Sequence, residues 1–134
     1  LRGVEVPPRL VPLAIDEFPI LFVAAACAEG ETVVVGVAEL RVKESDRIAA
    51  MAEGLAALGA DVEALADGMR IRGGRLSGGR VASHGDHRVA MCFAVAAARA
   101  DGEVRIDDVA NVATSFPAFL GVASAAGLDV RPLA

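Results

Sequence analysis

The sequence lacks several features that mark particular protein classes. Its 134 residues include no tryptophan, no tyrosine and only two cysteines, Cys27 and Cys92. The longest uncharged apolar runs, residues 18–28 and 89–98, are well short of the ~20 residues that cross a bilayer. The N-terminus also lacks the charged, apolar and small-residue order of a signal peptide. We therefore expect a soluble, cytoplasmic protein with no membrane partner.

The low number of cysteines and the negative net charge argue against further kinds of site and partner. Both cysteines lie in Ala-rich apolar stretches, so we expect reduced, buried thiols rather than metal ligands. The net charge of −5 argues against nucleic acid as a partner, and any anionic ligand needs a local cluster of positive charge. Because the first residue is Leu1 rather than Met, we expect the chain to be cropped from a longer protein.

The sequence contains an internal repeat. The segment from Asp16, DEFPILFVAAACAEGETVVVGV, has the same order of features as DHRVAMCFAVAAARADGEVRID from Asp86. The segments from Ser45 and Ser115 also match, and both pairs of starts are 70 residues apart. Repetition of this kind fixes architecture. It predicts two units, at about residues 14–82 and 83–134, with residues 1–13 as the tail of a preceding unit.

Local signals predict helix, strand, helix, strand in each unit. The four segment starts are good N-cap residues, and glycines stand where the helices should stop. They are Asp16, Ser45, Asp86 and Ser115, and Gly30, Gly59, Gly102 and Gly127. Residues 32–37 and 103–107 read as strands, residues 62–72 as a hairpin turning at Asp67-Gly68, and residues 73–79 as a loop. This alternation predicts an α/β fold with Ala-rich helices packed on a mixed sheet.

The first candidate site lies in RVKESDR, residues 41–47. Lys43 is the only lysine in the chain, and with Arg47 it lies at a predicted helix start, where free amides and the helix dipole also attract anions. Glu44 adds a carboxylate that can transfer protons. The alternative is a solvated helix start whose charges pair with each other, and the residues alone leave both interpretations open.

The second candidate site, SHGDHR at residues 83–88, contains both histidines and Arg88. Two histidines and one aspartate could bind a metal, but no further histidine or cysteine lies nearby, so we predict no metal site. A polar, capped helix start without a further role is the alternative. Asp16 either caps its helix or acts as a base toward a substrate hydroxyl. Ser115 has no charged neighbour and is expected only to cap.

Three strings carry a resemblance to a known family. LRVKESDRIAAMAEGLAALGADV (residues 40–62), DHRVAMCFAVAA (86–97) and ATSFPAF (113–119) resemble the enolpyruvyl transferase family, and within it the 5-enolpyruvylshikimate-3-phosphate synthases. The resemblance spans residues 15–130. It implies domains built from βαβαββ units around a pseudo-threefold axis, with helix N-termini facing a cleft. This chain would form part of the C-terminal domain, with the N-terminal domain absent.

The resemblance also implies a reaction and roles for five residues. The family transfers the enolpyruvyl group of phosphoenolpyruvate to the 5-hydroxyl of shikimate-3-phosphate, with no metal and no organic cofactor. Asp16 matches the proton acceptor at that hydroxyl, Lys43 a contact to shikimate-3-phosphate, and Glu44 a carboxylate in proton transfer. Arg47 and Arg88 match the pair that binds the phosphoenolpyruvate carboxylate. The other partner implied is the N-terminal domain, without which we expect no turnover.

One further residue, His87, matches the family, and two positions depart from its pattern. His87 lies beside the arginine pair, and Glu39 falls where many members have an asparagine that contacts shikimate-3-phosphate. Val112-Ala113-Thr114 stands where many members have Arg-Lys-Thr. This change resembles the bacterial branch associated with glyphosate tolerance, so we expect weak binding of that inhibitor.

Three alternatives compete with this assignment. The sister enzyme acting on UDP-N-acetylglucosamine shares the fold but lacks the first two strings in this form. Loss of a site residue would favour a non-catalytic fragment that keeps only the fold. None of the five is lost, which argues against such a fragment: they are Asp16, Lys43, Glu44, Arg47 and Arg88. RNA-end cyclisation on the same fold fits poorly with the acidic balance.

Overall fold

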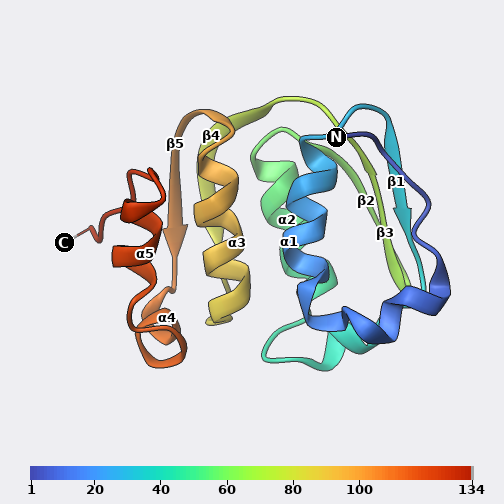
Figure 1. Cartoon of the computed structure of the whole chain (residues 1–134), viewed down its shortest axis with the longest axis horizontal. Helices are drawn as coiled ribbons and strands as arrows, with labels where there is room; N and C mark the ends of the chain where they lie inside the picture. The colour runs from blue at the N-terminus through green and yellow to red at the C-terminus, as the bar shows by residue number, and fades with distance from the viewer. Residues whose placement is uncertain (134) are drawn as a thin grey trace.

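The computed structural model describes residues 1–133 as an α/β fold with three parallel helices between two small sheets (Figure 1). The helices are α1 (Phe18–Ala26), α2 (Arg47–Ala57) and α3 (His87–Ala97). Each has a closely packed apolar side, and α2 contacts both sheets. The predicted α/β class with helices on mixed sheet is confirmed.

The first sheet is antiparallel, in the order β1 (Glu31–Val34), β3 (Gly68–Arg72) and β2 (Asp61–Leu65). The predicted hairpin is confirmed, since β2 and β3 pair from Asp61 opposite Arg72 to Leu65 opposite Gly68. Gly68 lies so close to β1 that an added Cβ would be 1.8 Å from the carbonyl oxygen of Val34. Only glycine permits that approach.

The second sheet pairs β4 (Leu76–Ala82) with β5 (Ala100–Asp107) in parallel. The loop prediction for residues 73–79 is therefore wrong from Leu76 onward. A segment of small residues is typical of a turn, but here the missing side chains allow close pairing of two strands: a Cβ on Gly78 would lie 2.7 Å from the carbonyl oxygen of Glu103. Gly102, predicted to stop a helix, lies within β5 because α3 already ends at Ala97.

The helix starts differ in part from the predicted caps. Asp86 caps α3 by accepting from two amides, as predicted. Asp46, not Ser45, caps α2, and Asp16 caps nothing because it lies in the short 3₁₀ helix η2 (Ile15–Glu17) before α1. Ser115 ends α4 (Ala110–Ser115), and α5 (Phe119–Ala125) begins later. The two remaining 3₁₀ helices are η1 (Pro8–Leu13) and η3 (Ala38–Val42).

The first residues belong with the first sheet. Bridges join Arg2 to Glu29 and Glu5 to Val33 in parallel, and the amide of Val6 donates to Val33. Sequence periodicity cannot reveal this pairing, and the boundaries predicted from the repeat, with residues 1–13 as the tail of a preceding unit, stay a prediction. On the pairing we propose another division, in which the first βαβαββ unit runs from this extended segment to β3 and β4 opens the second.

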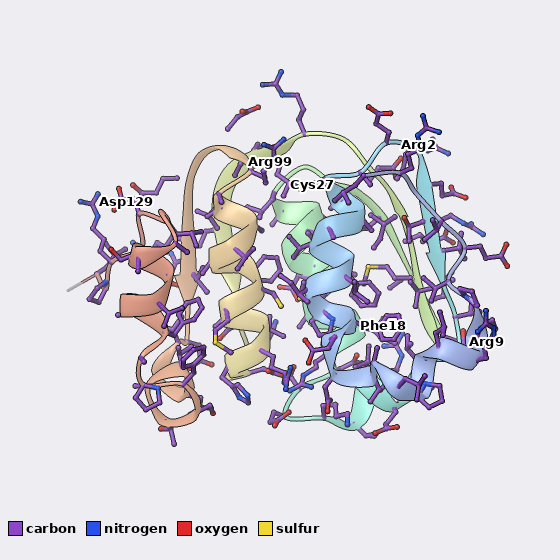
Figure 2. The ribbon with its side chains drawn as sticks, in the orientation of Figure 1. Arg2, Arg9, Phe18, Cys27, Arg99 and Asp129 are labelled. Carbon is purple, nitrogen blue, oxygen red and sulfur yellow. The ribbon has the colours of Figure 1, made fainter. Side chains whose placement is uncertain are left out.

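The core is apolar, and many of its side chains come from α1, α2 and α3. It is built around Phe22, Met51 and Phe93, each fully buried. Figure 2 shows Phe18 directed inward, whereas arginines such as Arg9 and Arg99 extend from the periphery. Within residues 1–133, none of the helices combines the length and the apolar character needed to cross a membrane.

Both cysteines are free thiols. Cys27 is half-buried at the end of α1, and Cys92 is buried in α3. Burial raises the pKa of the Cys92 thiol to about 12, so it is a neutral group at physiological pH. The expectation of reduced thiols that act as small apolar side chains fits this environment.

Candidate active site

Three helices begin at the same end of the molecule. The starts of α1, α2 and α3 lie together at the lower end of Figure 1. Because the helices run in the same direction, their free amides and the positive ends of their dipoles point to one region. The two strings singled out in the sequence, residues 41–47 and 83–88, both lead into these starts. This end of the fold is therefore favourable for an anion.

Arg47, the first residue of α2, is the centre of the cluster. Its side chain is only 1% exposed and contacts carboxylates from three segments. Its Nε donates to Asp86 at 2.8 Å, one Nη donates to Asp16 at 3.2 Å, and the other Nη pairs with Glu44. A buried guanidinium requires such compensation, because an unpaired charge in the interior is costly.

Asp86 is the buried partner of Arg47. Its side chain is 0% exposed and also accepts from the hydroxyl of Ser45 at 2.9 Å and from the amides of Arg88 and Val89. Burial alone would raise the pKa of this carboxyl, but the hydrogen bonds from Arg47 and Ser45 outweigh it and lower the pKa below the ordinary value. Asp86 is therefore an ionised carboxylate inside the protein.

Lys43 joins the cluster from the other side. Its ammonium donates to Glu39 at 2.8 Å and lies 3.2 Å from Asp16. The hydrogen bond from Lys43 is the main reason why the pKa of Asp16 is lowered. The same contacts, first Glu39 and then Asp16, raise the pKa of Lys43. At neutral pH Lys43 is thus a cation and Asp16 an ionised carboxylate that can accept a proton.

Arg88 completes the group of cations. Its guanidinium donates to the backbone carbonyl of Asp16 at 3.1 Å and to Glu17 at 3.2 Å, and it is 36% exposed. His87, the first residue of α3, is half-buried beside it. The other histidine, His84, lies 3.4 Å from Glu53 in a left-handed backbone conformation.

The structure brings most of the predicted site residues together. Asp16, Lys43, Glu44, Arg47 and Arg88 form one connected network, and Glu39 joins it through Lys43. The 113–119 string lies elsewhere, lining an apolar groove of about 710 Å³ between β5, α4 and α5. Among residues 1–133, no group of three or more His, Cys, Asp or Glu side chains is arranged to hold a metal ion.

Sequence reasoning missed two members of the network. Asp86 was predicted only as a helix cap, and Ser45 only as the cap of α2, yet the two side chains meet across a sequence separation of 41 residues. The repeat places Ser45 and Asp86 at related helix starts, and this was the only sequence pattern that could have linked them. The repeat could not reveal that the Asp86 carboxylate accepts hydrogen bonds from residues of both helix starts.

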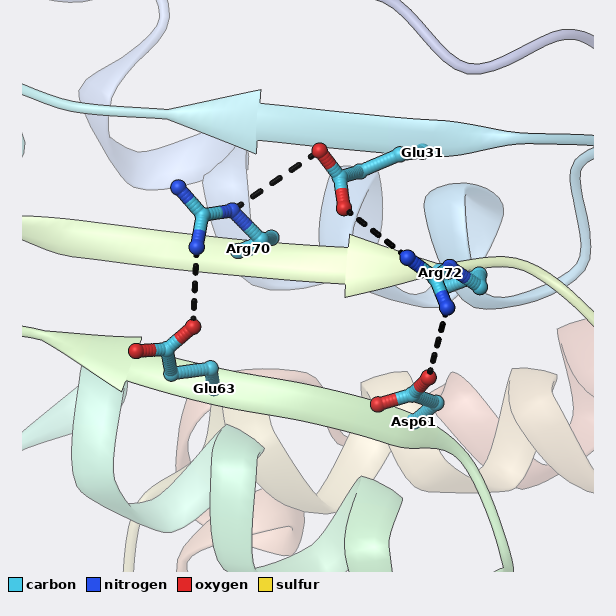
Figure 3. A pocket seen from close by; sticks show the side chains of 5 residues that line it. All are labelled: Glu31, Asp61, Glu63, Arg70 and Arg72. Carbon is cyan, nitrogen blue, oxygen red and sulfur yellow. Dashed lines mark hydrogen bonds and ion pairs between the residues drawn. The ribbon is translucent and has the colours of Figure 1, made fainter.

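A second group of charges has a different character. Glu31, Asp61, Glu63, Arg70 and Arg72 alternate across the outer face of the first sheet, and Figure 3 shows the ion pairs that join them from strand to strand. These side chains are largely exposed. Exposed pairs of this kind contribute little to stability, so the ladder is a solvated sheet face rather than a site.

The chain is similar in sequence and in fold to known proteins. A family model described as EPSP synthase (3-phosphoshikimate 1-carboxyvinyltransferase) matches residues 2–122. Proteins named 3-phosphoshikimate 1-carboxyvinyltransferase are 66% identical over 128 residues in Acidithiobacillus ferrooxidans and 63% identical over 131 residues in Nitrosococcus oceani. These matches cover 96% and 98% of this chain but 30% of each relative.

Solved structures give the same result. A structure of EPSP synthase from Acinetobacter baumannii superimposes with a TM-score of 0.92 at 52% identity, covering 96% of this chain and 31% of that one. A second structure of the enzyme from the same organism gives a TM-score of 0.93 at 46% identity. The chain spans about 30% of the length of the curated relatives that it matches. On the family match, the relatives and the fold, this chain belongs to the EPSP synthase family.

Proposed function

We propose that this chain forms part of the active site of a 3-phosphoshikimate 1-carboxyvinyltransferase. The enzyme would transfer the enolpyruvyl group of phosphoenolpyruvate to the 5-hydroxyl of shikimate-3-phosphate and release phosphate, in the cytoplasm. The observation that carries the proposal is the convergence on Arg47 of carboxylates from three helix starts, with Lys43 and Arg88 alongside.

Arg47 and Arg88 are the proposed ligands of the phosphoenolpyruvate carboxylate. A planar guanidinium binds a carboxylate through two parallel hydrogen bonds, which a lysine cannot do. Arg47 is held rigidly by its burial, whereas Arg88 is partly exposed and can move toward a ligand. His87 lies beside Arg88, and the three helix dipoles add to the attraction for anions.

Asp16 and Glu44 are the proposed proton carriers. The 5-hydroxyl oxygen bonds to C2 of phosphoenolpyruvate, its proton passes to Asp16, and C3 gains a proton through Glu44, which gives a tetrahedral intermediate. The bond from C2 to the phosphate oxygen then breaks, and C3 returns a proton. Lys43 keeps Asp16 ionised and contacts shikimate-3-phosphate, and Glu39 holds Lys43 in place.

The remaining substrate contacts would come from outside this chain. Because the chain covers about 30% of its relatives, we propose that residues 1–134 are part of the C-terminal domain and supply the C-terminal half of the site. An N-terminal domain would hold the phosphate of shikimate-3-phosphate. The 134-residue chain alone is therefore expected to have no turnover.

A chimera tests the proposal directly. In it, this chain replaces the matching segment of the A. ferrooxidans relative, to which it is 66% identical. The chimera is expected to form 5-enolpyruvylshikimate-3-phosphate and release phosphate from the two substrates. Arg47→Lys should reduce kcat/KM by at least about tenfold, whereas the matched change Arg70→Lys on the outer sheet face should not. A folded chimera without turnover would refute the proposed function.

A further inference from the structure

We infer that Asp86 is a positioning residue that orients the guanidinium of Arg47 for the substrate carboxylate. The inference deepens the proposed function and rests on it. Asp86 is the only one of the carboxylates around Arg47 that is completely buried in the described part of the chain; Asp16 and Glu44 are 45% and 53% exposed. It therefore lies behind Arg47, not at the surface that a ligand reaches.

The hydrogen bonds of Arg47 distinguish two edges of its guanidinium, an inner edge that pairs with Asp86 and an outer edge that pairs with the exposed carboxylates. Asp86 accepts from Nε at 2.8 Å and from one Nη at 3.3 Å, so it occupies the inner edge of the guanidinium. The remaining edge, formed by the two Nη atoms, points to Asp16 and Glu44. A guanidinium has few edges that can bind a carboxylate through two hydrogen bonds. By taking one of them, Asp86 presents the other outward.

Helix capping does not account for Asp86 on its own. Its Oδ1 accepts from the amides of Arg88 and Val89, and an asparagine oxygen could do the same. Its Oδ2, however, accepts only from Arg47 and from Ser45 among the described residues. A buried carboxylate is costly, and an asparagine would avoid that cost. The charge of Asp86 is explained by the buried guanidinium of Arg47, which requires a carboxylate as its partner.

One carboxylate thus holds both arginines of the proposed site. Through Oδ2 it fixes the side chain of Arg47 on α2, and through Oδ1 it fixes the backbone of Arg88 at the start of α3. The position of the Arg47 guanidinium relative to the backbone of Arg88 depends on this contact. A small displacement of groups that bind a substrate can reduce its productive binding strongly.

The substitution Asp86→Asn separates capping from orientation, because asparagine keeps an oxygen for the amides and places an NH₂ group against the Nε–H of Arg47. In the chimera, the KM for phosphoenolpyruvate is expected to rise on the order of 100-fold, and the KM for shikimate-3-phosphate less than about threefold. The matched control is Asp46→Asn at the cap of α2, where the Asp46 carboxylate accepts from the amide of Ala49 and from Arg41 but not from the guanidinium of Arg47. It should leave both KM values unchanged.

A second measurement does not require turnover. In the 134-residue chain, the Nε–H of Arg47 should exchange slowly with solvent by NMR, and Asp86→Asn should accelerate its exchange by at least about tenfold. If Asp86→Asn fails to fold, Ser45→Ala, which removes one partner of Asp86, should still raise the KM for phosphoenolpyruvate by about threefold to tenfold.

The outcomes separate the two proposals. A selective rise in the KM for phosphoenolpyruvate together with fast exchange at Arg47 supports the role of Asp86. Equal effects of Asp86→Asn and Asp46→Asn on that KM, or slow exchange at Arg47 in Asp86→Asn, would overturn it. An unsubstituted chimera without turnover refutes the proposed function instead, and the exchange of the Arg47 Nε–H then decides alone whether Asp86 orients the guanidinium.

Discussion

Gly54 offers a sharp test of how α2 and α3 pack, and hence of what holds Arg47 near Asp86. Gly54 lies in α2 opposite the ring of Phe93 in α3. A Cβ added at Gly54 would lie 2.0 Å from Cζ of Phe93 and 2.6 and 2.8 Å from its two Cε atoms. Such distances are far below van der Waals contact, so Gly54→Ala must displace the ring or separate the helices.

The expected magnitude follows from two opposing effects. In a helix interior, alanine is more favourable than glycine by about 0.5–1 kcal/mol. Overpacking a buried site costs about 1–3 kcal/mol, and Phe93 is fully buried. We therefore expect Gly54→Ala to lower the free energy of unfolding by about 0.5–2 kcal/mol. In α5, where a Cβ on Gly121 would meet nothing within 4 Å, the same change should stabilise by up to about 1 kcal/mol.

Urea unfolding of the 134-residue chain measures both variants under the same conditions. The double variant Gly54→Ala/Phe93→Leu provides a further control, because loss of the ring should remove most of the clash and make the two effects non-additive. If Gly54→Ala stabilises the chain as much as Gly121→Ala does, α2 and α3 do not approach as described. The contact between Arg47 and Asp86 would then lose its structural basis.

Three further predictions concern the charged cluster. Glu44→Gln should tighten binding of phosphoenolpyruvate to the chimera by about twofold to fivefold, since an exposed internal competitor for Arg47 is removed, while turnover falls; weaker binding in calorimetry would contradict this. Lys43→Gln should raise the pKa of Asp16 toward its ordinary value, because Lys43 is the main cause of its depression, and an unchanged carboxyl titration by NMR would count against it. The pKa of Asp86 is also lowered, so its contribution to stability is complete above the unfolded pKa of about 3.9 and is lost as the pH falls through the folded value. Urea unfolding at neutral and acidic pH should therefore show a smaller loss of stability on acidification in Asp86→Asn than in the unsubstituted chain.

The sequence predicted the parts of the fold that depend on local chemistry. The hairpin at Asp67-Gly68 and the cap at Asp86 follow from short-range preferences, and both are present. Pairing over long distances was not predictable in this way. Residues 76–79 read as a glycine-rich loop, yet they pair in β4 because their small side chains fit against β5. Likewise, no short-range sequence pattern predicts that the first residues pair with Glu29 and with β1.

The sequence was sufficient to predict which residues form the candidate site, but not which of them contact each other. The repeat and the charged helix starts identified Lys43, Arg47 and Arg88, and the structure places them together around Asp16. Burial was not visible in the sequence, where Arg47 has the appearance of an exposed first-turn residue. Its side chain is 1% exposed and pairs with Asp86, 39 residues away.

The central claim is that separate helix starts build one binding site for the phosphoenolpyruvate carboxylate. Calorimetric titration of phosphoenolpyruvate into the chimera carrying Arg47→Lys, Arg88→Lys or both changes tests this most directly. Each single change is expected to raise the dissociation constant by at least about tenfold, and the double change should raise it by less than the product of the two. Unchanged binding in the single variants, or losses that multiply as for independent sites, would contradict the account.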